Sequence, residues 1–199
     1  DNNGSQSLIG ALRWRSADMS TWVNYSFMRG NEQNAPGHSV QMPHARVISP
    51  RDQLREHHSL VAIFHPAPAL ETSAEVLWGR QKGDGQADTV DVITGPGFSG
   101  DQWSGVNAQA LYRTAPDVQY GLRLEHFRNG KGIALTPITL VGGNFNAVTV
   151  GLKYDYSKAV VFRPEIRHDW QSKHNGVNAF GGGTANRQTT VSADVVFYF

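Results

Sequence analysis

The sequence predicts an all-β chain that folds as an antiparallel, up-and-down transmembrane β-barrel. The clearest indication is the C-terminal segment VSADVVFYF, in which apolar side chains recur at every second position: Val191, Ala193, Val195, Phe197 and Phe199. Side chains at this spacing lie on one face of a strand. Such a strand at a soluble sheet edge would template aggregation, whereas a barrel strand has both edges paired and one face in lipid. A soluble β-sandwich is the alternative explanation of this segment.

The composition is consistent with one large β domain, and residues 1–199 are treated as a single domain. The formal net charge is +1, and Lys and Arg are scattered rather than clustered as a nucleic-acid surface would require. The chain has no cysteine, which excludes thiolate metal sites, cysteine catalysis and disulfides. No apolar run approaches the ~18 residues of a membrane helix. The mean hydropathy of −0.41 suits a barrel, because half of each strand faces a wet lumen.

Four passages share one layout of strand, tight turn and strand, with an aromatic residue near the exit: 12–30, 61–83, 109–132 and 151–173. Their turns centre on Asp18, Pro68, Pro116 and Lys158, where Pro, Asp and Ser supply turn geometry. With the terminal segment, these hairpins predict about nine strands, over 7–16, 19–29, 58–65, 71–81, 105–114, 118–128, 146–157, 159–171 and 187–199.

The alternation of apolar and polar residues supports most of these strands. It is visible in the second strand, where Val23 and Tyr25 face away from Asn24, and it is clearest in the last three. His168 is the one polar side chain on the apolar face of its strand. The strands near 59–65 and 72–80 alternate less regularly, and their faces are left unassigned.

Two observations favour a barrel over a sandwich. Aromatic residues stand at strand ends, where membrane interfaces hold two girdles: Trp14, Trp22, Phe64, Trp78, Tyr112, Tyr154, Tyr156, Trp170 and Phe199. Short turns also alternate with long loops, near 32–57, 84–104, 129–145 and 172–187. Outer-membrane barrels have short periplasmic turns and long extracellular loops. The long loops are therefore predicted to be extracellular.

Three passages carry a resemblance to a known family: NAVTVGLKYDYSKAVVFRPEIRHDW (146–170), ALYRTAPDVQYGLRLEHFRNGKG (110–132) and the terminal VSADVVFYF. In these the chain resembles the OmpL-like β-barrel porins, and a looser likeness extends back to residues 8–27. The resemblance implies a channel in the bacterial outer membrane and transfers no binding residues. Single-chain barrels have even strand numbers. Nine strands therefore predict the C-terminal part of a longer barrel, and the resembled family implies about sixteen strands in all.

The sequence carries no recognisable catalytic, cofactor or metal signature, so the protein is predicted not to be an enzyme. His57 and His58 are adjacent and point to opposite faces of a strand, so they cannot chelate together. There is no G-x-S-x-G nucleophile motif. GDGQAD (83–88) lacks the full ligand set of a calcium loop, and the glycines of FGGGTANR (180–187) lie between two strands rather than before a helix.

Charged residues on the polar face give the best functional indication. Arg13, Arg15 and Glu75 belong to this face, and ten further residues are predicted to line a pore: Arg113, Arg123, Glu125, Lys153, Asp155, Arg163, Glu165, Arg167, Asp169 and Asp194. On a lipid face each would cost ~2–4 kcal/mol at mid-membrane, so this face should be the lumen. Opposed charges in a wet lumen orient and filter hydrated solutes.

The predicted function is therefore passive diffusion of small hydrophilic solutes or ions. Two alternatives are kept: a barrel whose ion pairs only fill the lumen, serving as a scaffold or anchor in a larger outer-membrane assembly, and a soluble β-sandwich binding module. The expected partners are outer-membrane lipid and the barrel-assembly machinery, which would engage the strand ending at Phe199. A homo-oligomer or a larger complex is left open, and nucleic acid is not expected.

Overall fold

The computed structural model describes residues 6–31, 54–82, 100–131, 142–174 and 176–199. These residues form nine strands and one 3-10 turn, η3 (Gly181–Gly183). The strands are β1 (Leu8–Arg15), β2 (Thr21–Gly30), β3 (Arg55–Ala67), β4 (Leu70–Lys82), β5 (Gly100–Ala115), β6 (Val118–Asn129), β7 (Gly143–Ser157), β8 (Val160–His174) and β9 (Arg187–Phe197).

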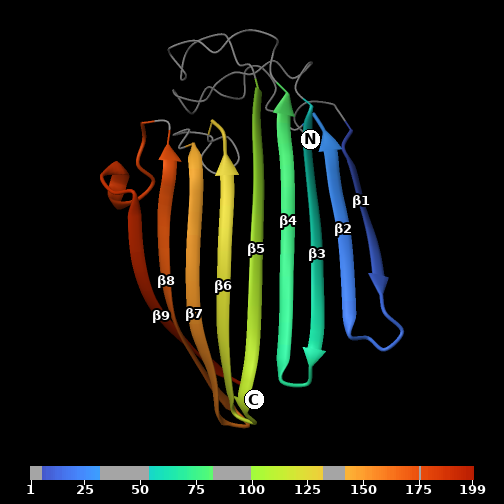
Figure 1. Cartoon of the computed structure of the whole chain (residues 1–199), viewed down its shortest axis with the longest axis vertical. Coiled ribbons are helices and arrows are strands. Elements are labelled where there is room, and N and C mark those ends of the chain that lie inside the picture. Colours follow the sequence, from blue (N-terminus) through green and yellow to red (C-terminus); the bar gives the residue numbers. More distant parts are fainter. Residues whose placement is uncertain (1–5, 32–53, 83–99, 132–141, 175) are drawn as a thin grey trace.

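All nine strands belong to one antiparallel sheet in the order β1 to β9, each paired with its neighbours in sequence (Figure 1). Within the described residues β1 pairs only with β2 and β9 only with β8, so the sheet is open at both edges. This up-and-down meander is the arrangement of a transmembrane β-barrel, and the predicted fold class is confirmed. Each predicted strand is found, but β3 and β5 extend further than predicted, beginning at Arg55 and Gly100.

Tight turns join the strands at one end of the sheet, here called the turn end. Pro68–Ala69, Pro116–Asp117 and Lys158–Ala159 are two-residue connections. In the β1–β2 turn, the Ser16 hydroxyl and the amide and hydroxyl of Ser20 hydrogen-bond to Asp18 and lower the pKa of its carboxyl. The C-terminus also lies at the turn end (Figure 1). The opposite end, where β2, β4 and β6 stop, is called the loop end.

The strand register divides the side chains into two faces. Residues paired directly across an antiparallel ladder share a face. Leu122, Val150, Ile166 and Val191 form one such row, and similar rows make an apolar face that runs from β1 to β9. The neighbouring row contains Arg123, Thr149, Arg167 and Thr190, and belongs to a polar face. The register also assigns the two strands left open by the sequence, because Leu60 and Val76 pair with each other on the apolar face.

Burial on this sheet is the reverse of that in a soluble protein. Val150 on the apolar face is 54% exposed, whereas the preceding Thr149 on the polar face is 5% exposed. The other buried side chains of the described strands, among them Asp101, Asp169 and Gln171, also lie on the polar face. A sandwich would cover its apolar face with a second layer, but no described element covers this one. An exposed apolar face is what lipid requires, and it argues against the soluble sandwich.

The apolar face forms a band that descends across the sheet. The last apolar side chain toward the loop end is Trp78 on β4 and Val191 on β9. Through directly paired positions, Trp78 is level with Asn144 on β7, whereas Val191 is level with Val150. The band therefore falls by six residues (150 − 144) between β4 and β9. At ~3.3 Å per residue and ~4.8 Å per strand, this corresponds to strands tilted by about 40° from the membrane normal, as in β-barrels.

This tilt explains why His168 does not disturb the apolar face. On β8 the band ends at Ile166, so His168 lies beyond it toward the loop end. There its Nδ1 is 2.8 Å from the Thr189 hydroxyl, and its ring stacks on Trp170. In the sequence His168 looks like a polar residue on an apolar face only because a single strand does not show where the membrane ends.

Aromatic side chains follow both edges of the band. The lower edge, toward the turn end, carries Trp14, Phe64, Tyr112, Tyr154 and Phe197, and the upper edge carries Phe27 and Trp78. The prediction was wrong for Trp22. The register places Trp22 in the row of Arg15 and Ile63 on the polar face, and the Arg13 guanidinium lies 5.2 Å from its ring centroid. A tryptophan at a strand end can therefore lie on the polar face as well as at the membrane interface.

The assignment of faces predicts opposite effects for two neighbouring residues. Leu152→Arg places a cation near the middle of the β7 band and should destabilise the inserted barrel by ~2–4 kcal/mol. Lys153→Leu changes the polar face and should have a much smaller effect. The folded fraction is measured by heat-modifiable gel mobility after refolding of the full-length protein in lipid. Equal folding of the two variants would contradict the assignment of faces.

Candidate functional site

The candidate site is the polar face, which carries all ten residues predicted to line a pore. The register places them on β5 to β9, on the side of the sheet opposite the apolar band. In chain order they are Arg113, Arg123, Glu125, Lys153, Asp155, Arg163, Glu165, Arg167, Asp169 and Asp194. Their common face is thus a geometric finding, whereas their contact with a permeating solute stays a prediction.

Four of these residues form one ion-pair network at the middle of the face. Arg167 on β8 donates to Glu125 on β6 through one terminal nitrogen and to Asp169 through Nε, at 2.8 Å. Arg123 donates its Nε to the same Glu125 oxygen at 3.1 Å. Both guanidinium groups also lie within hydrogen-bonding distance of the Thr149 hydroxyl on β7, at 3.4 and 3.5 Å. Two positive and two negative charges therefore balance across three strands.

A second group of pairs lies closer to the turn end. Arg163 on β8 binds Asp194 on β9 with two parallel hydrogen bonds of 2.8 Å, the fork geometry that favours arginine over lysine. Lys153 pairs with Asp155 along β7, with Nζ 2.9 Å from Oδ1. Glu165 accepts a hydrogen bond of 3.2 Å from the Ser192 hydroxyl. The contacts of Arg163 and Glu165 tie β8 to β9 on the polar side, whereas the Lys153–Asp155 pair lies within β7.

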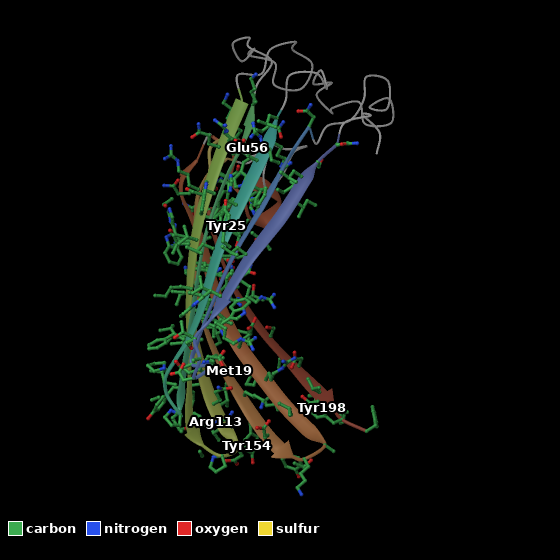
Figure 2. All side chains as sticks on the ribbon, turned by 90° about the vertical axis from the view of Figure 1, so that its right-hand side faces the viewer. Met19, Tyr25, Glu56, Arg113, Tyr154 and Tyr198 are labelled. Carbon is green, nitrogen blue, oxygen red and sulfur yellow. The ribbon has the colours of Figure 1, made fainter. Side chains whose placement is uncertain are left out.

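Arg113 stands apart from these networks. Its terminal nitrogen donates to the Pro116 carbonyl oxygen at 3.0 Å, which holds the side chain over the β5–β6 turn. Figure 2 shows Arg113 at the turn end of the sheet, together with Tyr154. Nine of the ten predicted residues thus take part in ion pairs or polar contacts with other side chains of the polar face. Arg113 contacts only the β5–β6 turn, at the edge of that face.

Further polar residues extend the face toward β1. Glu75 on β4 accepts hydrogen bonds from the Ser59 hydroxyl at 2.6 Å and from the Asn107 amide at 2.9 Å. Arg13 and Arg15 on β1 have no acidic partner among the described residues. The charges are therefore balanced near β6 to β9, while the β1 side carries uncompensated positive charge.

A shallow groove crosses the polar face where two glycines pair. Gly121 and Gly151 are direct partners on β6 and β7, and the absence of side chains leaves a cavity of about 170 Å³. Its walls include Arg123 and Thr149 toward the loop end and Lys153 toward the turn end. This groove is open, and its lining mixes charged side chains with apolar ones such as Leu111.

The sequence missed a cluster around Trp103, because residues 84–104 were predicted as a loop. Trp103 lies inside β5 on the polar face, and its Nε1 is 3.2 Å from Nδ1 of His57. The Arg55 guanidinium lies 4.9 Å from its ring centroid. Gly79 is the direct partner of Trp103, and a Cβ there would lie 2.4 Å from the indole. The pairing of Gly79 with Trp103 could have indicated this cluster, because a glycine leaves room for a large ring on the neighbouring strand. That pairing is visible only when the strand register is known.

Gln171 was also missed. It lies buried on the polar face, and its amide nitrogen donates to the carbonyl oxygens of Gly142 and Val177, at 3.1 and 3.2 Å. Its amide oxygen accepts the Ala179 backbone N–H at 3.1 Å. One side chain therefore holds the connection between β8 and β9 against the loop end of the polar face. The glycines of that connection form η3, between strands as predicted.

Nothing in the described residues indicates catalysis or metal binding. His57 and His58 lie on opposite faces, beside Gly79 and Trp78 respectively, as predicted. No group of three or more potential metal ligands is found in the described part of the chain. His38, His44 and the GDGQAD segment lie outside it. None of the described segments is a helix of the length and apolarity needed to cross a membrane.

Comparison with known proteins agrees with this geometry. The model of the family described as "Putative beta-barrel porin-2, OmpL-like" matches residues 1–199, which is the whole chain. The match therefore includes β1 and β2, where the resemblance read from the sequence was loosest. No curated protein is similar enough to be matched with the chain. From its sheet, its exposed apolar band and this match, the chain belongs to the OmpL-like β-barrel porin family.

Proposed function

We propose that the protein is a porin of the bacterial outer membrane, through which small hydrophilic solutes or ions diffuse along a charged lumen. Family membership supports a porin-like role of this barrel. The observation that carries the proposal is the gathering of charged residues on one face of the sheet, opposite the apolar band. The ten predicted charged residues of β5 to β9 all lie on this face. Charges are costly in lipid, so this face is suited to a water-filled lumen.

The width of the barrel decides whether this face can conduct. Both edge strands must be paired in a membrane, because no water is present to satisfy their backbone groups. We infer that further strands of the same protein complete the ring, giving about sixteen strands in total. Barrels of sixteen strands enclose an aqueous channel, whereas eight-stranded barrels are filled by side chains. A wide ring would leave the charges of β5 to β9 facing water.

The arrangement of charge suggests how solutes would be filtered. Paired residues such as Arg163 and Asp194 place unlike charges side by side and leave this part of the wall close to neutral. The β1 side adds the positive charge of Arg13 and Arg15. We propose that this uneven distribution of charge orients hydrated solutes as they diffuse through the lumen.

The scaffold alternative is favoured by one observation. Arg167 holds two carboxylates, which is also what a side chain in a filled, non-conducting lumen would do. In that case the barrel would act as an anchor in a larger assembly, and its full-length form would not conduct. In both cases we propose outer-membrane lipid as its surroundings. The C-terminal segment, β9 with the residues up to Phe199, is then what we propose the barrel-assembly machinery engages.

The topology is tested by labelling two single-cysteine variants on intact cells with a membrane-impermeant reagent. Gly182→Cys, in the β8–β9 connection, should be labelled, and Lys158→Cys, in the β7–β8 turn, should be labelled only after lysis. This result is expected because outer-membrane barrels expose long loops and keep short turns in the periplasm. Labelling of Lys158→Cys alone on intact cells would reverse the topology.

Conduction is tested with the full-length protein in planar bilayers. We expect open channels, and we expect Arg123→Gln, Arg163→Gln and Arg167→Gln together to move the reversal potential in a salt gradient toward cation selectivity. The reason is that Glu125, Asp169 and Asp194 lose their partners and remain negative. Field focusing by the low-dielectric wall should make the change several-fold in permeability ratio.

A matched triple variant controls for the loss of charge itself. Arg29, Arg80 and Arg128 lie on the outward face, so changing all three to Gln should leave selectivity as in the wild type. If the wild type does not conduct, the scaffold hypothesis replaces the porin hypothesis. A conducting channel in which both triple variants behave alike would show that the inward arginines do not set selectivity.

A further inference from the structure

The outward face carries a charged row immediately beyond the aromatic edge of the apolar band. Arg29 on β2, Glu56 on β3 and Arg80 on β4 are direct cross-strand partners in this row. Figure 2 shows Glu56 near the loop end of the sheet. Arg128 on β6 and Lys82 on β4 lie nearby on the same face and add further positive charge. These side chains face away from the lumen, so conduction does not account for them.

One carboxylate orients both arginines of this row. Oε1 of Glu56 lies 3.1 Å from Nε of Arg29, and Oε2 of Glu56 accepts a hydrogen bond from Nε of Arg80. The Glu56 side chain is 14% exposed, whereas the two arginine side chains are 60% and 61% exposed. The terminal nitrogens of both guanidinium groups make no hydrogen bond within the described part of the chain. Each arginine is thus held at Nε and presents its outer N–H groups.

A stack of aromatic rings lies directly below, one row further toward the turn end. His58 and Trp78 stack with ring centroids 5.1 Å apart and planes 9° apart, and Phe27 stacks on the other side of His58. The Tyr25 hydroxyl lies 2.8 Å from Nδ1 of His58 and fixes that ring. Rings packed in this way form a rigid platform at the membrane interface.

The position of the charged row determines which part of the membrane its side chains contact. Beyond the apolar band, an outward side chain enters the headgroup layer of the membrane rather than its hydrocarbon. Arg29 and Arg80 are two strands apart, roughly 10 Å at the backbone, so one anionic group between them could reach both. Guanidinium forks match the oxygens of phosphate, and the row has an excess of one positive charge over Glu56.

We propose that Arg29 and Arg80, oriented by Glu56 above the platform of Phe27, His58 and Trp78, bind the phosphate of a phosphorylated lipid headgroup. The site lies in the outer leaflet if the loop end is extracellular, so in this respect it rests on the proposed function. The arginines supply the phosphate contacts, and the platform supports the apolar or ring portion of the same lipid. Glu56 is a positioning residue, which touches the arginines and not the phosphate.

The test uses the full-length protein in detergent, with diphosphorylated lipid A added in mixed micelles. Lipid A should raise the unfolding temperature read by heat-modifiable mobility, while dephosphorylated lipid A and inorganic phosphate should not. Arg29→Gln with Arg80→Gln should weaken the apparent affinity roughly tenfold or more, as expected for loss of two charge-assisted contacts. The control is Arg15→Gln with Arg113→Gln, two exposed arginines on the polar face, which should bind as the wild type does.

Glu56→Gln separates an oriented site from general attraction to anions. It raises the positive charge of the row, so simple attraction predicts tighter binding. The proposed site predicts weaker binding, because the guanidinium groups lose their orientation. Unchanged binding by the double arginine variant, or tighter binding by Glu56→Gln, would overturn the proposal. Stabilisation by inorganic phosphate alone would overturn it too, because the lipid would then be dispensable.

Failure of this site and failure of the porin are distinguishable. Lipid binding in detergent does not require an open pore, and conductance does not require these outward arginines. If the protein distinguishes lipid A from its dephosphorylated form but does not conduct, the lipid site is supported and only the porin proposal is refuted. Conductance without discrimination between lipid A and its dephosphorylated form refutes only the site.

Discussion

The structure depends on one constraint, the pairing of every backbone group across an unbroken antiparallel ladder. A membrane offers no water to an unpaired N–H or C=O group, so each strand must follow the register of its neighbours. Because side chains alternate with a period of two, this register decides the face of every residue at once. A slip of one residue in β7 would move Lys153 and Asp155 into lipid and Leu152 onto the polar face. The backbone ladder therefore determines where the charges of the polar face can be.

The ion pairs on the polar face in turn stabilise the strand register that brings their residues together. Arg167 connects β8 to β6 through Glu125 and bridges β7 at Thr149, so it spans three strands. Arg163 and Asp194 connect β8 to β9. Exposed pairs of this kind contribute little stability singly, ~0–1 kcal/mol each, but a network shared over several strands resists a change of register. The same contacts keep unlike charges side by side, so this part of the polar face is close to neutral.

Local sequence signals predicted the turns and most of the strands. The two-residue turns at Pro68, Pro116 and Lys158 carry their geometry in their own residue types, and a hairpin register follows from its turn. The pairings across long connections have no such local signal. The contact of Arg167 with Glu125 joins residues 42 positions apart through β7. The sequence therefore predicted a common face but not which charges meet on it.

The errors have the same physical origin. His168 was marked as a polar intruder, and Trp22 as an interface residue, because a strand read alone shows its faces but not the height of the membrane. That height emerges only when the paired strands are compared and the band is seen to descend from Trp78 to Val191. Trp103 was missed because its strand begins in residues that read as a loop, and its partner Gly79 belongs to another hairpin. Tilt and register are properties of the sheet, so no single segment contains them.

The two edges of the apolar band carry different residues on the outward face. Tyrosine, tryptophan and phenylalanine line the turn edge, from Trp14 to Phe197, and the described strands carry no row of oriented arginines on the outward face there. The loop edge has its aromatic residues too, but Arg29 and Arg80 stand beyond them with Glu56 between. One register thus presents a charged polar face inward and, at the loop edge, a cationic rim outward.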